Sequence, residues 1–184
     1  MSSTLHLVEA VPTHPGRQNA LTLIDALSAA IAPSGAEIIE AQVAGDGERV
    51  FVIVETTNAL DLLAAITAKA LPEADEIHEP APVRLVGADL EEIKATRPPA
   101  GYLVEWDLPA GLDMPTYLAR KKEKSPKYAE VPEVSFLRTY VREDMEKCLC
   151  LYDAPDVDTV IRAREVVSTP IDRLHTLLSL KDVR

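Results

Sequence analysis

The sequence is poor in cysteine and in long apolar runs. Its two cysteines, Cys148 and Cys150, are separated by one residue on an expected strand, so we expect two reduced thiols instead of a disulfide. No apolar run approaches the roughly 20 residues that span a bilayer, and the first residues lack the basic start of a signal peptide. We therefore expect a cytoplasmic protein that does not enter a membrane.

Several motifs of common enzyme classes are also missing. The chain has no glycine-rich phosphate loop, no GxSxG and no paired metal-box cysteines, which argues against a kinase, a nucleotidase or a serine hydrolase. Positive charge is scarce, because the net charge is −11 and the first half carries most of the acidic excess. Such a chain repels phosphate backbones, so we expect no nucleic-acid partner. The basic run at 120–127 is short and favours a solvated helix face.

What the sequence does have is an internal duplication. The stretch from Ile39 aligns without a gap with the stretch from Leu137 at one offset, since Asp46 meets Asp144 and 144 − 46 = 98. LVEA at residues 7–10 answers LVEW at 103–106, and DEIH at 75–78 answers DRLH at 172–175. A self-match of this length predicts two copies of one supersecondary unit. We place one domain at residues 1–95 and the other at 96–184.

Each copy shows the order strand, helix, strand, strand, helix, strand. In the first copy we expect strands at 5–11, 36–44, 49–57 and 76–86, with helices at 20–32 and 59–71. The second copy repeats this order, although Pro126 should end or kink its first helix. Residues 89–95 read as a connecting helix. Two βαββαβ units in series predict an α+β fold of tandem ferredoxin-like repeats.

The third strand of each copy is apolar on both faces. Val50, Val52 and Val54 alternate with Phe51 and Ile53, and residues 148–152 repeat the pattern. A sheet with helices on one side only should show polar residues on the other face. We therefore expect the two copies to pack sheet to sheet as a pseudo-symmetric dimeric α+β barrel. A homodimer that covers the same faces between chains is the alternative.

The second copy resembles a known family. GYLVEWDLPAGLDM, RTYVREDMEKCLCLYDAPD and PIDRL, within residues 101–178, are similar to a small bacterial family of ferredoxin-like domains that includes nickel-binding members. The resemblance implies a sheet that dimerises and a transition-metal site, nickel in particular. Two positions depart from the family pattern, because Arg138 and Ala163 stand where members tend to have histidine. Arginine donates no lone pair to a metal.

Histidine and cysteine provide the candidate metal ligands. His78 and His175 occupy equivalent places near the last strand of each copy, and His6 lies on the first strand. Imidazoles and the Cys150 thiol suit nickel, copper or zinc. No close HxxxH or CxxC spacing is present, so isolated histidines and core thiols are the alternative interpretation.

Polar and aromatic residues suggest a ligand site, mainly in the second copy. Glu9 and Glu105 sit at equivalent places in otherwise apolar strands, where a carboxylate must be paired or shifted in pKa. Brought together by pseudo-symmetry, the two could bind a cation or act as acid and base, so both are candidate ligand-binding residues. All five tyrosines and the only tryptophan belong to the second half. We predict a pocket lined by Glu105, Arg138 and the aromatic residues Trp106, Tyr140 and Tyr152. The alternative is that the carboxylates form ordinary ion pairs and the aromatic rings pack in the core.

These observations lead to one leading hypothesis and two alternatives. The leading hypothesis is a non-catalytic protein that binds a small molecule or a transition metal and forms a homo-oligomer, with no catalytic residue. The first alternative is a cofactor-free α+β barrel enzyme, an oxygenase or isomerase, acting on a small hydrophobic acid. There Arg138 would hold the anion, Glu105 or His175 would act as base, and Tyr140 or Tyr152 would donate a hydrogen bond. The second alternative is an assembly or scaffold module.

Overall fold

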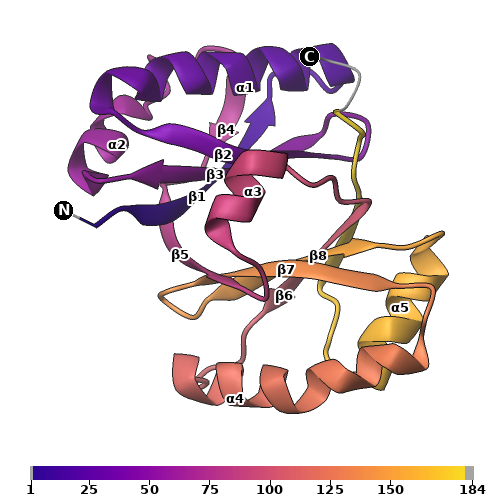
Figure 1. Cartoon of the computed structure of the whole chain (residues 1–184). Helices are drawn as coiled ribbons and strands as arrows, with labels where there is room; N and C mark the ends of the chain where they lie inside the picture. The colour runs from indigo at the N-terminus through magenta and orange to yellow at the C-terminus, as the bar shows by residue number, and fades with distance from the viewer. Residues whose placement is uncertain (1, 181–184) are drawn as a thin grey trace. The chain divides into compact units, whose positions relative to one another are not determined.

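The computed structural model describes residues 2–180 and divides into two compact units (Figure 1). The first unit contains residues up to 83 together with 89–98, and the second contains residues 84–88 and those from 99 on. The predicted boundary at 95/96 thus falls at the end of a helix, α3 (Leu90–Thr96), which belongs to the first unit. No helix among residues 2–180 is long and apolar enough to cross a membrane.

The first unit is a βαββαβ arrangement. Its elements are β1 (Thr4–Pro12), α1 (Arg17–Ile31), β2 (Glu37–Ala44), β3 (Arg49–Thr56), α2 (Ala59–Ala65) and β4 (Ala74–Ile77), followed by β5 (Ala81–Val86). β1 is central, because it pairs antiparallel with β3 on one side and with β4 and the start of β5 on the other. β2 pairs with β3 at the edge.

The second unit repeats the arrangement. It runs β6 (Tyr102–Asp107), α4 (Met114–Lys124), β7 (Ser135–Arg142), β8 (Lys147–Asp153), α5 (Val157–Val166) and β9 (Arg173–Thr176). The strand order is β7, β8, β6, β9, all antiparallel. Figure 1 shows α4 and α5 on one face of this sheet, where they cover a core that includes Val104, Cys150 and Val160.

The duplication extends to local details of the backbone. Asn58 caps α2 and Asp156 caps α5, each accepting hydrogen bonds from backbone amides of the first turn. The second strand of each repeat has a bulge at the matching place, between Ile38 and Glu40 in β2 and between Phe136 and Arg138 in β7. Equivalent caps and bulges show that the two repeats share one fold as well as one sequence pattern.

Two predicted elements differ from the structure. The expected helix at 59–71 ends at Ala65, and Thr67 then accepts a hydrogen bond from the amide of Ala70 through its side chain, which competes with helical pairing. The expected strand at 76–86 is split into β4 and β5, because Pro80 and Pro82 have no amide hydrogen for a continuous ladder. In the second repeat, α4 ends at Lys124 and continues as a 3-10 turn containing Pro126, as predicted.

Both faces of the third strand of each repeat are buried. Val50, Val52 and Val54 are 0% exposed, while Phe51 and Ile53 on the other face are at most 3% exposed. Residues 148–152 of β8 are likewise at most 2% exposed. The apolar pattern on both faces therefore predicted burial correctly, and the closing of the two sheets on each other stays a prediction.

A glycine in the β2–β3 turn offers a test of the fold. Gly47 has φ +88°, and a Cβ there would lie 2.3 Å from the backbone of Gly16. Gly35 has a similar φ of +74°, but a Cβ there meets nothing within 4 Å. We expect Gly35→Ala to cost about 1 kcal/mol from φ alone, and Gly47→Ala about 2–4 kcal/mol because the backbone must also move. Urea unfolding measures both, and equal losses would contradict the close contact.

Candidate functional site

The candidate site lies on the sheet face of the second unit that points away from α4 and α5. Val104 on β6 packs in the helix-side core, so strand alternation directs its neighbour Glu105 to the opposite face. Leu149 on β8 is the register partner of both Glu105 and Tyr140. Glu105, Leu149 and Tyr140 therefore share this face across three adjacent strands.

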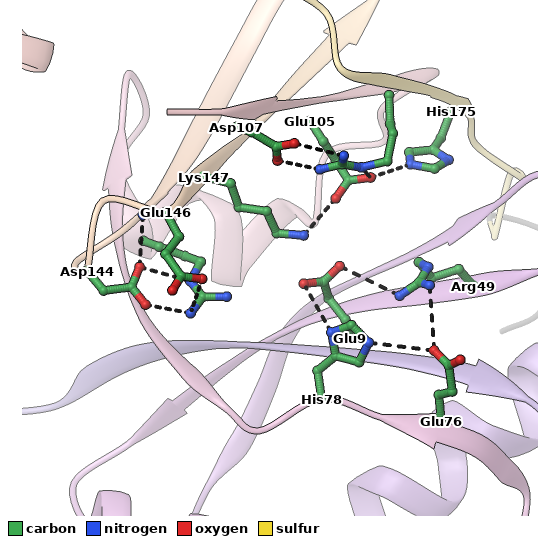
Figure 2. Close-up of polar contacts among 12 residues, drawn as sticks. Glu9, Arg49, Glu76, His78, Glu105, Asp107, Asp144, Glu146, Lys147 and His175 are labelled. Atoms are coloured by element: carbon green, nitrogen blue, oxygen red, sulfur yellow. Dashed lines mark hydrogen bonds and ion pairs between the residues drawn. The ribbon is translucent and has the colours of Figure 1, made fainter. Parts of the chain in front are cut away.

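Glu105 is almost fully buried, at 3% exposed, and is surrounded by three nitrogen donors. One carboxylate oxygen accepts a hydrogen bond from the Lys147 ammonium at 2.7 Å. The other oxygen lies 2.8 Å from Nε of Arg173 and 2.7 Å from Nε2 of His175 (Figure 2). Asp107 binds the far side of the Arg173 guanidinium, at 3.0 Å from Nη1. Two carboxylates thus face two permanent cations and one imidazole.

These contacts decide the ionisation of Glu105. Burial by itself would raise its pKa, but hydrogen bonds from His175, Lys147 and Arg173 outweigh burial and hold the pKa well below its usual range. The carboxylate is therefore ionised at neutral pH. Because an ionised carboxylate can only accept hydrogen bonds, its 2.7 Å contact with His175 requires a hydrogen on Nε2 and orients the imidazole. A carboxylate that orients an imidazole in this way is the arrangement of a general base.

The first repeat contains the same residue types at equivalent positions with longer contacts. Glu9 on β1 lies 3.9 Å from the Arg49 guanidinium and 4.0 Å from Nδ1 of His78. Glu76 also faces both Arg49 and His78, at 3.9 and 3.7 Å (Figure 2). The carboxylate, the cation and the histidine recur at offsets of 96, 98 and 97. In the second repeat the histidine is at hydrogen-bond distance from its carboxylate.

The structure divides the predicted ligand residues between the two faces of the sheet. Arg138 and Tyr140 on β7 are 2% and 1% exposed and lie on the Glu105 face, opposite Leu151 and Leu149. Trp106 and Tyr152 lie on the helix side, in the core with α4 and α5. They do not line one pocket with Glu105, because residues alternate between faces along β6 and β8.

The predicted metal ligands also lie apart within their units. His6 is buried on β1 at 4% exposed, and burial lowers its pKa. His78 pairs with Glu9, and His175 pairs with Glu105. Cys150 lies on the helix side of β8 with its sulfur 3.9 Å from that of Cys148, and both thiols are free. Over residues 2–180, no three His, Cys, Asp or Glu side chains are grouped to hold a metal ion, so the residues present do not supply a nickel site.

Sequence reasoning did not single out Lys147 and Arg173, the two cations that contact Glu105. Lys147 aligns with Arg49, so the basic residue at both equivalent positions could have indicated a partner for the carboxylate of each repeat. Arg173 has no basic counterpart, because the matching residue in the first repeat is Glu76. Its role appears only when β9 pairs with β6 and sets Arg173 in register with Glu105.

Several solved structures share this fold. The candidate chlorite dismutase TA0507 is 12% identical and matches 99% of this chain and 98% of its own, with a TM-score of 0.57. A candidate monooxygenase from Lactobacillus acidophilus NCFM is 9% identical over 97% of this chain and 94% of its own, with a TM-score of 0.52. A mutant chlorite dismutase from Candidatus Nitrospira defluvii gives 10% identity, coverage of 100% and 94%, and a TM-score of 0.52. No curated protein matches the sequence.

These comparisons confirm one prediction and correct another. The α+β fold of tandem ferredoxin-like repeats is confirmed, because the matches extend over both repeats. The leading hypothesis of a non-catalytic metal- or ligand-binding protein is wrong, because structures named as chlorite dismutase and monooxygenase share the fold along nearly the whole chain. The enzyme alternative agrees better with them.

Replacing Glu105 tests whether its ion pairs hold this face together. Removal of one partner from a buried pair costs about 3–5 kcal/mol, but Arg173 is 44% exposed, so we expect Glu105→Gln to cost about 2–3 kcal/mol at neutral pH. The pKa of Glu105 is lower in the folded chain than the ordinary 4.5, so this stabilisation is complete above that pH and is lost as the pH falls below it.

Urea unfolding of wild type and variant at neutral and acidic pH gives the measurement. The stability difference between them should shrink below about pH 4. Asp107→Asn is the matched control, because Asp107 also binds Arg173 but is 51% exposed, and should cost about 0.5 kcal/mol. A pH-independent difference, or equal losses in the two variants, would show that Glu105 is not held as described.

A family model also matches the chain, over residues 102–177, and its description is nickel responsive protein SCO4226-like. The match lies within the second repeat and confirms the resemblance predicted for residues 101–178. It supports a metal-related family for this repeat and assigns no metal to this chain. The second repeat is thus similar to the SCO4226-like nickel responsive proteins, and the whole chain has the fold of the chlorite dismutase and monooxygenase structures.

Proposed function

We propose that this chain is a general-base enzyme of the α+β barrel type that acts on a small hydrophobic acid. The observation that carries the proposal is the 2.7 Å contact between His175 Nε2 and the buried Glu105 carboxylate. Glu105 keeps its charge at neutral pH, so it can stabilise the imidazolium that forms when His175 takes a proton. His175 is 23% exposed, whereas Glu105 is buried, so the imidazole is the member of the pair that a substrate can reach.

The charges around the dyad suit an acidic substrate. Lys147 and Arg173 lie against Glu105, and Arg138 shares the sheet face with it. Lys147 and Arg173 are already paired with Glu105 and Asp107, so a substrate carboxylate would be held by the Arg138 guanidinium, while His175 removes a proton from a neighbouring carbon or hydroxyl. Leu149 and Leu151, buried on the same face, favour a hydrophobic substrate body. The reaction class is therefore isomerisation, or oxygenation that begins with proton removal.

The named relatives support the enzyme class without giving the substrate. Chlorite dismutase and monooxygenase are names of proteins only 9–12% identical to this chain, so their reactions are not transferred. We predict a small molecule as the partner of this chain. We also predict a homo-oligomer, and sedimentation velocity can measure its oligomeric state. Of the predicted ligand residues, we propose Glu105, Arg138 and Tyr140 as parts of this site.

Proton exchange tests the proposal directly. The probe is phenylpyruvate in D2O, a small aromatic acid whose C3 protons exchange by general-base catalysis, followed by NMR. We expect wild type to accelerate the exchange and His175→Asn to lower the enzymatic rate by about 10²-fold or more. His78→Asn, at the equivalent position of the first repeat, is the matched control and should leave the rate unchanged. A wild type without acceleration, or a His175 variant with full rate, would refute the proposal.

A further inference from the structure

A second site lies on the helix side of the second unit, on the face of the sheet opposite to Glu105. There the structure has a cavity of about 140 Å³ between β6, β8, α4, α5 and the turn after α5. Its walls include the aromatic rings of Trp106, Tyr117 and Tyr128. With a water molecule taking about 30 Å³ of liquid, this space suits a ligand of a single ring and is too small for a drug-sized molecule.

The charged side chains that line this cavity are all positive. Arg120, Lys121, Lys124 and Arg164 contribute to the wall, and none of the Asp or Glu residues between positions 2 and 180 does. Arg164 is 2% exposed, so its guanidinium has been removed from water. Burying a charge is costly unless it is paired and hydrogen-bonded. Within the described part of the chain, the four cations of this cavity therefore have no carboxylate beside them to compensate their charge.

The protein satisfies Arg164 only in part. Nη1 donates to the Tyr152 hydroxyl at 3.1 Å and lies 3.5 Å from the Cys150 sulfur, while Nη2 donates to the carbonyl of Pro170. Within residues 2–180, Nε of Arg164 has no hydrogen-bond partner although it is buried. Hydrogen bonding by Cys148 and the nearby charges of Arg164 and Lys121 lower the pKa of the Cys150 thiol. Even an ionised Cys150 leaves the cations in excess.

The first repeat shows that the fold does not need this polar group. At the equivalent positions, Cys150 corresponds to Val52, Tyr152 to Val54 and Arg164 to Ile66, all of them buried. Trp106 corresponds to Ala10, which is also buried. The same ferredoxin-like core is thus built from aliphatic residues in one repeat and from a cationic, aromatic group in the other. A purely structural role does not explain that difference, because apolar packing is the less costly solution.

We propose that this cavity binds a small aromatic carboxylate. The ring would pack against Trp106, Tyr117 and Tyr128, and the carboxylate would pair with Arg164 and with Lys121 at the wall of the cavity. Bidentate pairing with a guanidinium accounts for an arginine at this depth in place of a lysine. This site is separate from the Glu105–His175 dyad and does not depend on the proposed reaction.

Trp106 makes the proposal measurable, because it is the only tryptophan of the chain and lines the cavity. Its ring lies 5.9 Å from the Arg164 guanidinium carbon. Titration with benzoate should change the Trp106 fluorescence in a saturable way. Benzamide, which has the same ring and no charge, should bind at least about tenfold more weakly. No saturable change with benzoate, or equal binding of benzamide, would overturn the proposal.

Variants locate the binding to this cavity. Arg164→Met should lower benzoate affinity by more than about tenfold, and Lys121→Met, less buried and safer for folding, by about threefold. Lys122→Met is the matched control, because Lys122 is exposed on the same helix and does not line the cavity, so affinity should stay unchanged. Equal losses in the Lys121 and Lys122 variants would mean that benzoate binds elsewhere.

One further variant separates this proposal from the enzyme proposal. His175→Asn should bind benzoate with unchanged affinity, since His175 lies on the other face of the sheet. Loss of proton exchange with intact benzoate binding is the expected pattern. If His175→Asn abolished the benzoate signal while Lys121→Met did not, the binding site would be the Glu105 face and the cavity proposal would fall.

Discussion

Burial on both faces of the central strands is the constraint on which the rest of this structure depends. Along β8, every residue from 148 to 152 is at most 2% exposed, so a polar side chain at these depths must find its partners inside the protein. Most of the chain meets this constraint with valine, leucine and isoleucine. In the second repeat the buried charged residues are Glu105, Arg138 and Arg164, and they mark the places where a side chain does something other than apolar packing.

Glu105 and Arg164, two buried charges of the second repeat, differ in how completely their partners compensate them. Glu105 is compensated almost completely, by an ammonium, a guanidinium and an imidazole within 2.8 Å. Arg164 is compensated by a hydroxyl, a carbonyl and a thiol, and no carboxylate of residues 2–180 is among its hydrogen-bond partners. A complete network favours an oriented and ionised carboxylate, which suits proton transfer. An incomplete one favours the capture of an anion from solution.

Because the chain is duplicated, comparing its two repeats separates features of the fold from features of one repeat alone. The backbone caps, the bulges and the strand order are the same in both repeats, so they belong to the fold. The carboxylate, cation and histidine recur as well, but with contacts near 4 Å in the first repeat and below 3 Å in the second. The aromatic and cationic cavity has no counterpart in the residues of the first repeat. Both proposed sites thus lie in the second repeat, on a scaffold that both repeats share.

The sequence by itself determined the duplication, the order of the elements and the burial of both strand faces, because these follow from local periodicity and from a self-match at fixed spacing. It also indicated Glu105 and His175, since each recurs in the other copy. Only the tertiary structure decided their partners, because Lys147, Arg173 and His175 are 42, 68 and 70 residues away from Glu105 and meet it through strand pairing. It also separated Tyr152 and Trp106 from Glu105, because neighbouring residues of a strand face opposite sides of the sheet.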